Sequence, residues 1–274
     1  MEKYVIMHDV APPAVGRQIR RIDDYQELLD AIGSDAFVRM EVMRDEPLNA
    51  WVTQSAYAVV SRDLEGDEGF AWLSAIGEPE EAARLVDIVL SEARDADGTI
   101  TQPVGFTVPR ALDVARWGGT VGEFSTWDVM VTESAPPAQP GEDAVRPLSD
   151  QSELSEIQAF LDAHSPRHSV AADKPSVQLW GGIRDEHDGT LLSIGALTLR
   201  GDRVPYLASI ATVPHARGRG YGAAVTAFLT RVALASGSPL CTLAHYHPNP
   251  AARSVYQRVG FRTTHQNVSS LLPR

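Results

Sequence analysis

The stretch that decides the fold is ATVPHARGRGYGAAV, residues 211–225. It puts Gly218, Gly220 and Gly222 at alternate positions, with Arg217 and Arg219 beside them. The first N–H groups of a helix have no internal partner, and glycine removes the Cβ atoms that would keep an anion from the backbone. The pattern therefore predicts an anion-binding turn at a helix start. An ordinary glycine-rich turn stays open, because short glycine motifs also arise by accident.

Two known phosphate loops do not fit this stretch. No Lys-Ser or Lys-Thr pair follows the last glycine, as a nucleoside triphosphatase loop requires. The glycines lack the spacing of a dinucleotide fold, and no acidic residue follows them to bind a ribose. The turn is therefore expected to hold an anion of another class.

Alternating strands and helices are predicted around the glycine turn. After it, four apolar residues repeat at helical spacing and predict one buried face: Val225, Phe228, Leu229 and Val232. Asn249 and Pro250 are typical of the start of a further helix, and Gly260 of its end. The other expected elements are a strand over 145–148, a helix from Ser149 or Asp150 to about 163, strands over 177–184, 190–200, 204–213 and 240–244, and a strand at Phe261.

The first half of the chain repeats part of this order. Strands are expected over 70–76, 99–104 and 127–132, and helices over 79–94 and 110–116. Residues 134–141 are small, polar and proline-rich, which predicts an exposed linker between domains at 1–140 and 141–274. Glu78, Glu80 and Glu81 stand where the second half has its glycines, and carboxylates repel phosphate from a helix start. The first half is therefore interpreted as a degenerate copy or a domain that shapes the substrate site.

Charge and composition exclude several classes of protein. The chain has 274 residues and a net charge of −12, of which residues 1–140 carry −14 and residues 141–274 carry +2. This balance argues against nucleic-acid or membrane partners. No apolar run approaches the roughly 18 residues that a membrane span requires, and the first residues lack the basic flank and apolar core of a secretion signal, so a cytoplasmic location is expected. The single cysteine, Cys241, excludes a disulfide framework and a thiolate metal cluster, and it is expected to be buried.

Two motifs together resemble the GNAT superfamily of N-acetyltransferases. The first is Thr212-x-Pro214-x-x-Arg217-Gly218-x-Gly220-x-Gly222, and the second is the run NPAARSVYQRVGF at residues 249–261. The resemblance covers about residues 142–268. It implies an α/β fold with a mixed central sheet flanked by helices, and acetyl-CoA as the acyl donor. The first half would then be a degenerate GNAT-like domain in tandem with it.

The resemblance also implies roles for individual residues. The backbone of Ile210, Ala211 and Thr212 would pair with the pantetheine arm, where an amide could polarise the thioester carbonyl. Asn249 would contact the same arm. Tyr256 would protonate the leaving thiolate, although on spacing alone it also fits a core aromatic. The diphosphate would lie on the turn, whose residues are Arg217, Gly218, Arg219, Gly220, Tyr221, Gly222 and Ala223.

The sequence departs from the family pattern at the general base. No Asp or Glu follows Asp202, and Ala244 stands where relatives that acetylate protein N-termini carry a glutamate. His245 is the candidate base, since histidine titrates near neutral pH. His247 and His168 are candidates for the acceptor site, with Asp173 a weaker one, and loop histidines without a chemical role remain the alternative. His245 and His247 lack a third metal ligand nearby, so no metal is expected.

The sequence thus predicts an acyltransferase that moves an acetyl or short acyl group from acyl-CoA to a primary amine. A small molecule is the favoured acceptor, and the negative field of the acidic first half would attract a cationic one. The competing hypothesis is a non-catalytic acyl-CoA-binding module that senses the cofactor or serves as a dimerisation partner. A homodimer is open under both hypotheses. Another acyl chemistry on the same fold also remains open, because a fold does not fix a reaction.

Overall fold

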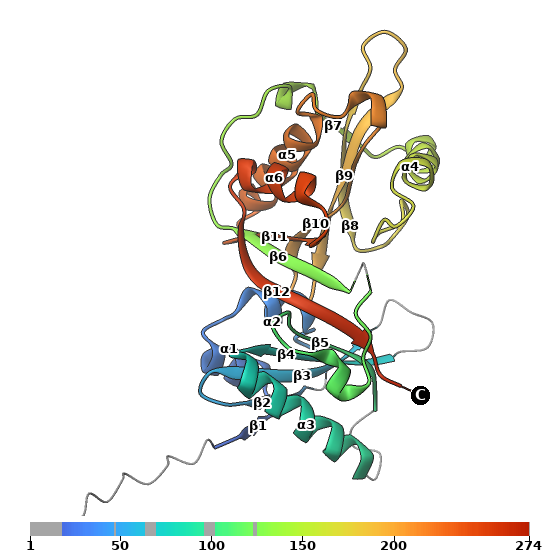
Figure 1. The fold of residues 1–274 in the computed structure, drawn as a ribbon. Helices are drawn as coiled ribbons and strands as arrows, with labels where there is room; N and C mark the ends of the chain where they lie inside the picture. The colour runs from blue at the N-terminus through green and yellow to red at the C-terminus, as the bar shows by residue number, and fades with distance from the viewer. Residues whose placement is uncertain (1–17, 47, 64–69, 96–101, 123–124, 274) are drawn as a thin grey trace, which may run out of the picture.

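A computed structural model describes residues 18–46, 48–63, 70–95, 102–122 and 125–273. Its strands form one twelve-stranded sheet in the order β1-β2-β3-β4-β5-β12-β6-β11-β10-β9-β8-β7, shown in Figure 1. Two strand pairs, β4 with β5 and β10 with β11, are parallel, and the rest are antiparallel. The expected mixed α/β architecture with flanking helices is confirmed.

The elements of the two halves follow a similar order, although α2, η2 and η3 have no counterpart in the other half. The first half consists of β1 (Arg20–Ile22), α1 (Tyr25–Ile32), α2 (Ala36–Glu41), β2 (Asn49–Val52), β3 (Ala56–Asp63), β4 (Phe70–Gly77), α3 (Pro79–Asp95), β5 (Pro103–Pro109), the 3-10 helix η1 (Val114–Trp117) and β6 (Thr126–Thr132). The second half consists of η2 (Glu142–Ala144), β7 (Arg146–Leu148), α4 (Gln151–His164), β8 (Val177–Arg184), β9 (Leu191–Arg200), β10 (Val204–Thr212), η3 (Pro214–Ala216), α5 (Tyr221–Ala235), β11 (Cys241–Tyr246), α6 (Pro250–Val259) and β12 (Arg262–Leu271).

The last strand of each half is inserted into the other half. β6 pairs with β11 on one side and β12 on the other, and β12 also pairs with β5. Figure 1 shows β6 and β12 side by side where the two halves meet. The division expected at residue 140 therefore does not separate two sheets.

Successive residues of β6 face opposite sides of the sheet, as strand geometry requires. Met130 lies in the core cluster that contains Tyr256 of α6 and Leu229 of α5. Val129 and Val131 lie in the cluster formed with α1, α2 and α4. Helices α5 and α6 thus cover one face, and α1, α2 and α4 cover the other.

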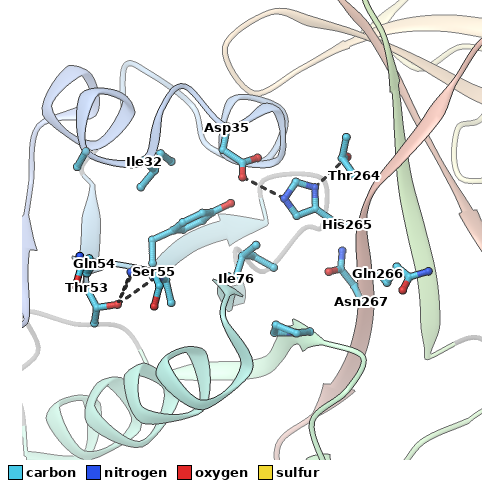
Figure 2. Close-up of a pocket in the computed structure, with 15 residues that line it drawn as sticks. Ile32, Asp35, Thr53, Gln54, Ser55, Ile76, Thr264, His265, Gln266 and Asn267 are labelled. Atoms are coloured by element: carbon cyan, nitrogen blue, oxygen red, sulfur yellow. Dashed lines mark hydrogen bonds and ion pairs between the residues drawn. The ribbon is translucent and has the colours of Figure 1, made fainter. Parts of the chain in front are cut away.

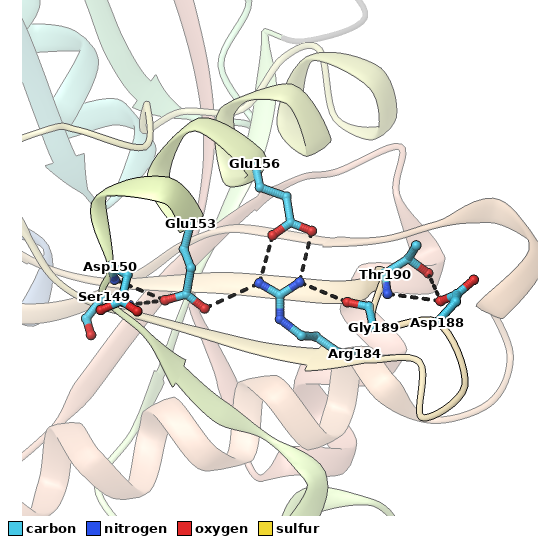
Figure 3. A network of polar contacts seen from close by, with 8 residues as sticks. All are labelled: Ser149, Asp150, Glu153, Glu156, Arg184, Asp188, Gly189 and Thr190. Carbon is cyan, nitrogen blue, oxygen red and sulfur yellow. Dashed lines mark hydrogen bonds and ion pairs between the residues drawn. The ribbon is translucent and has the colours of Figure 1, made fainter.

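Helix α4 is held on β8 by an ion-pair network, which Figure 3 shows. Arg184 donates from Nη1 and Nη2 to the two carboxylate oxygens of Glu156, at 2.9 and 2.7 Å. Glu153 accepts from Arg184 Nη2 at 3.3 Å and from the backbone N–H of Ser149 and Asp150 at the start of the helix. The Asp150 and Ser149 N–H groups, together with Arg184, lower the pKa of Glu153. Arg184 also donates to the Gly189 carbonyl, so the network ties the first turns of α4 to the end of β8 and to the β8–β9 turn.

Several sequence-based expectations for the first half need correction. The strand expected over 99–104 begins at Pro103, and residues 99–101 lie outside the described residues. The helix expected over 110–116 is only the 3-10 helix η1, because Asp113 caps it at Val114 and Gly118 ends it with φ +78°.

The linker and α5 differ from expectation as well. Within the linker, Pro136 and Gln139 are buried, whereas the other residues of 134–141 are exposed as expected. Arg231 of α5 donates to the Pro136 carbonyl and to Glu142. On α5 itself, Phe228 and Val232 of the expected face are only partly buried, and most of the alanines and both threonines are buried instead. Cys241 is buried, as expected.

Candidate active site

The glycine turn leaves the start of α5 open. Gly218 and Gly220 have φ of +79° and +90°, and no atom lies within 4 Å of the position that a Cβ would take at either residue. Gly220 caps α5 without any side-chain hydrogen bond, and the first turn contains no acidic residue. Arg217 donates from Nε to the Thr212 carbonyl at 3.1 Å and fastens the turn to the end of β10. An anion can therefore approach the backbone N–H groups of this helix end.

The corresponding helix start in the first half is occupied. The Glu78 side chain accepts from the Glu80 N–H at 3.0 Å, at the first turn of α3. Glu80 and Glu81 add further carboxylates there. Carboxylates at the start of α3 would repel a phosphate, whereas the backbone N–H groups at the start of α5 are accessible to one.

The parallel strands β10 and β11 separate beside the glycine turn. They pair only at Tyr206 with Thr242 and at Leu207 with Leu243, although β10 continues to Thr212. A β-bulge between Ala208 and Ala211 and a φ of +51° at Ser209 bend β10 at this point. The backbone of Ile210, Ala211 and Thr212 is thus unpaired with β11, and an extended ligand can add to it as a strand would.

Tyr256 and His245 lie next to each other at this opening. Tyr256 is 8% exposed, and its ring centroid is 6.0 Å from that of His245. Burial, and to a lesser degree Tyr206, raises the pKa of Tyr256, so the hydroxyl keeps its proton. Asn249 Oδ1 caps α6 by accepting from the Ala252 N–H at 3.1 Å, and its amide nitrogen is not used by this cap.

His245 is arranged as a proton acceptor. It is 7% exposed, and its Nδ1 lies 2.9 Å from the Tyr246 carbonyl oxygen. A carbonyl only accepts, so we assign the proton of the neutral ring to Nδ1 and the lone pair to Nε2. Among the described residues, Nε2 has no hydrogen-bond partner.

Asp128 is a carboxylate beside these residues that the sequence reasoning missed. It lies on β6 directly opposite His245 of β11 and is fully buried. Arg110 donates from Nη1 to Asp128 Oδ1 at 2.5 Å, and His247 Nδ1 lies 3.7 Å from Oδ2. The candidates named from the sequence all lie in the second half of the chain, whereas Asp128 lies in the first. The available signal was a charged residue inside the apolar run TWDVMVT, residues 126–132, because a buried charge requires partners.

The other predicted site residues are distributed around this opening. His247 follows β11, and its side chain is 43% exposed. His168 lies in the loop after α4, with its Nδ1 3.1 Å from the Ser165 carbonyl. Val170 of that loop exchanges two hydrogen bonds with the Ser209 hydroxyl at the bulge of β10. The structure thus brings the His168 loop to the opposite face of the opening, and it does not bring His168 to His245.

Two features are absent from the part of the chain that the structure describes. In residues 18–273, apart from the gaps given above, no three His, Cys, Asp or Glu side chains gather in a way that could hold a metal ion. No helix in the same residues has the length and apolar character needed to cross a membrane.

Comparisons with known proteins agree with this geometry. Residues 145–261 match the model of the acetyltransferase (GNAT) family. A mycothiol acetyltransferase from Nocardia farcinica is 32% identical over 124 residues, which is 45% of this chain and 34% of that protein. The match thus spans about a third of the length of this curated relative.

Two solved structures share the fold. A GCN5-related N-acetyltransferase from Kribbella flavida aligns with a TM-score of 0.50 and 18% identity, over 80% of this chain and 87% of that one. An acetyltransferase of the GNAT family from Colwellia psychrerythraea aligns with a TM-score of 0.50 and 15% identity, over 93% of this chain and 100% of that one. At these identities the likeness concerns the fold alone.

Proposed function

Because residues 145–261 form an acetyltransferase domain of the GNAT family, we propose that this chain transfers an acetyl or short acyl group from acyl-CoA to a primary amine of a small molecule. The observation that carries the proposal is the open helix start at Gly220 beside the separated strands β10 and β11. A diphosphate fits the first of these features and an extended amide arm fits the second.

The residues present fit acetyl-CoA, which supplies an activated thioester when bound. The positions of Gly218 and Gly220 are open where a Cβ would block a phosphate. The exposed Arg219 adds positive charge at the turn. The unpaired edge of β10 at Ile210, Ala211 and Thr212 offers backbone groups to an amide arm and a donor to a thioester carbonyl.

His245 and Tyr256 have different roles: His245 accepts the proton of the amine, and Tyr256 acts on the leaving thiolate. A primary amine has an ordinary pKa of about 10.4, so the ammonium must lose a proton before it reacts. We assign that proton to His245 Nε2, whose lone pair is unused. The raised pKa of Tyr256 makes it a weaker acid than a thiol of pKa about 8.5. Its O–H therefore stabilises a leaving thiolate mainly by hydrogen bonding, and complete transfer of its proton is uphill.

The test is a screen of small primary amines with acetyl-CoA and the purified chain, with released CoA detected by a thiol reagent. Cys241 is the single cysteine and is buried, and burial raises its pKa to about 12, so the protein itself will not react with the reagent. Turnover with any amine supports the proposal. Acetyl-CoA binding in calorimetry without turnover on any amine would favour the alternative, a sensor of acyl-CoA, and no binding at all would contradict both.

A further inference from the structure

A second pocket lies in the first half of the chain, and Figure 2 shows it. Its volume is about 430 Å³, within the range of about 300–1,000 Å³ that small-molecule sites occupy. Its walls come from α1, the turn after α1, the β2–β3 turn, the ends of β4 and β5, and β12 of the second half. None of the residues that line it belongs to α5, α6, β10 or β11.

The pocket exists because β4 and β5 separate in the same way as β10 and β11. Their pairing ends at Ser74 with Thr107, although β4 continues to Gly77. Gly77 has a φ of +122°, and a Cβ there would lie 2.3 Å from the Ser55 carbonyl oxygen. Glycine thus allows the end of β4 to close against the β2–β3 turn, where the Glu78 N–H donates to Ser55 O at 2.9 Å.

Two buried polar groups of this pocket have no hydrogen-bond partner among the described residues. They are Asn267 Nδ2, in a residue that is 1% exposed, and Tyr57 Oη, in a residue that is 4% exposed. In Figure 2 the Asn267 amide lies on the side of the pocket that holds Ile76 and His265. Burial and the nearby Asp35 carboxylate raise the pKa of Tyr57, so its hydroxyl stays protonated. Buried donors without acceptors are rare in folded proteins, so a ligand or water is expected to accept from them.

The charge in the pocket comes from Asp35. Its Oδ1 accepts from the Phe37 N–H at 2.7 Å, and its Oδ2 lies 3.1 Å from His265 Nε2. Each carboxylate oxygen can accept a further hydrogen bond. A neutral His265 that donates Nε2–H leaves the negative charge of Asp35 in place, and none of the described residues that line the pocket is a Lys or Arg. The field therefore favours a cation.

We propose that this pocket is a second ligand site, which binds a small molecule carrying a primary ammonium group next to a hydrogen-bond-accepting oxygen. The ammonium contacts Asp35, and the oxygen accepts from Asn267 Nδ2 and Tyr57 Oη. The β12 wall ties the site to the second half of the chain, so both halves build it. The site is separate from the proposed acyl-transfer site, and its occupancy does not require acyl-CoA.

The test uses the full chain, labelled with ¹⁵N, at pH 8 without acyl-CoA. The probe is 2-amino-1,3-propanediol, and its matched neutral control is glycerol, in which a hydroxyl replaces the amine. The side-chain amide of Asn267 gives two signals that Asn267→Leu identifies by their loss. We expect the amino diol to shift these signals saturably, and glycerol to bind at least tenfold more weakly.

Two variants decide whether Asp35 selects the cation. Asp35→Asn keeps an oxygen to cap α2 and removes the charge. The affinity for the amino diol should therefore become about equal to the affinity for glycerol. Asp30→Asn, a matched change on the exposed face of α1, should keep the preference. If Asp35→Asn perturbs the fold, Tyr57→Phe, which should weaken amino diol binding severalfold, replaces it.

Three outcomes would overturn the proposal. Equal shifts with both probes would mean that charge does not select the ligand. No shift with either would mean that the pocket holds only water. Loss of binding when CoA, which has no acyl group to transfer, is added would place the amine in the acyl-transfer site instead, and the amine screen described above reports on that site independently.

Discussion

Asp128 and His245 lie directly opposite each other on the neighbouring strands β6 and β11, one from each half of the chain. Both side chains are buried, and in a directly opposed pair the Cβ atoms lie about 4.5–5.5 Å apart. The first half therefore places a carboxylate opposite His245, a residue type that the chain after Asp202 lacks. The proposed site depends on the exchange of strands between the halves.

Replacing Asp128 by asparagine should destabilise the protein by about 3 kcal/mol, because it leaves Arg110 without its charged partner in a largely buried position. The matched control is Glu133→Gln, just after the end of β6, whose pair with Arg262 is exposed on both sides. That change should cost less than about 1 kcal/mol. Urea unfolding measures both values, and equal losses would mean that the buried pair contributes no more than a surface one.

Tyr256→Phe should lower kcat about 100-fold and leave acetyl-CoA affinity within about twofold, since the ring stays and only the hydroxyl that stabilises the thiolate is lost. Tyr25→Phe is the control, because Tyr25 is also a buried tyrosine but lies on α1. Steady-state kinetics and calorimetry separate the two effects. An unchanged kcat in Tyr256→Phe would identify Tyr256 as a core aromatic only.

Gly220→Ala should cost about 1 kcal/mol of stability, because φ +90° is strained for a residue with a Cβ. It should also weaken acetyl-CoA binding at least about tenfold, or about 1.4 kcal/mol, since the Cβ enters the space proposed for the diphosphate. The matched control is Gly189→Ala in the β8–β9 hairpin, which adds a Cβ at a similar φ of +75° and also into open space. Should both variants bind acetyl-CoA as the wild type does, the diphosphate lies elsewhere.

Cys241 predicts a dependence of stability on alkaline pH. Burial raises its thiol pKa from 9.0 to about 12 in the folded protein. Between these values the folded state holds a proton that the unfolded state has released, so folding stability falls as pH rises, by about 1.4 kcal/mol per pH unit. The stability difference between the wild type and Cys241→Ala should therefore shrink between pH 9 and 12. A difference that stays constant over that range would show that the thiol is not shielded as the structure indicates.

Much of the second half follows from local pattern. The glycine turn, the helix that it starts and the helix that Asn249 caps lie where the sequence predicts them, because caps, αL glycines and apolar spacing act over a few residues. The first half was harder to predict. The apolar and turn signals around residues 99–116 did not reveal that β5 starts at Pro103 or that a single 3-10 turn follows.

The site was predicted only in part for the same reason. Tyr256 and His245 could be named because they lie within a few residues of recognisable motifs. Asp128 and Arg110 could not, because their proximity to His245 depends on which strands pair. The pocket around Asn267 and Asp35 likewise combines residues from opposite ends of the chain.

The sequence by itself determined the elements and the open helix start at Gly220, since backbone conformation and capping depend on near neighbours. Only the tertiary structure decided that β6 and β12 exchange places, which sets Asp128 beside His245 and His265 beside Asp35. Strand pairing uses the same backbone groups in every sheet, so the choice of partner is made by how side chains pack on both faces, and no local pattern records it.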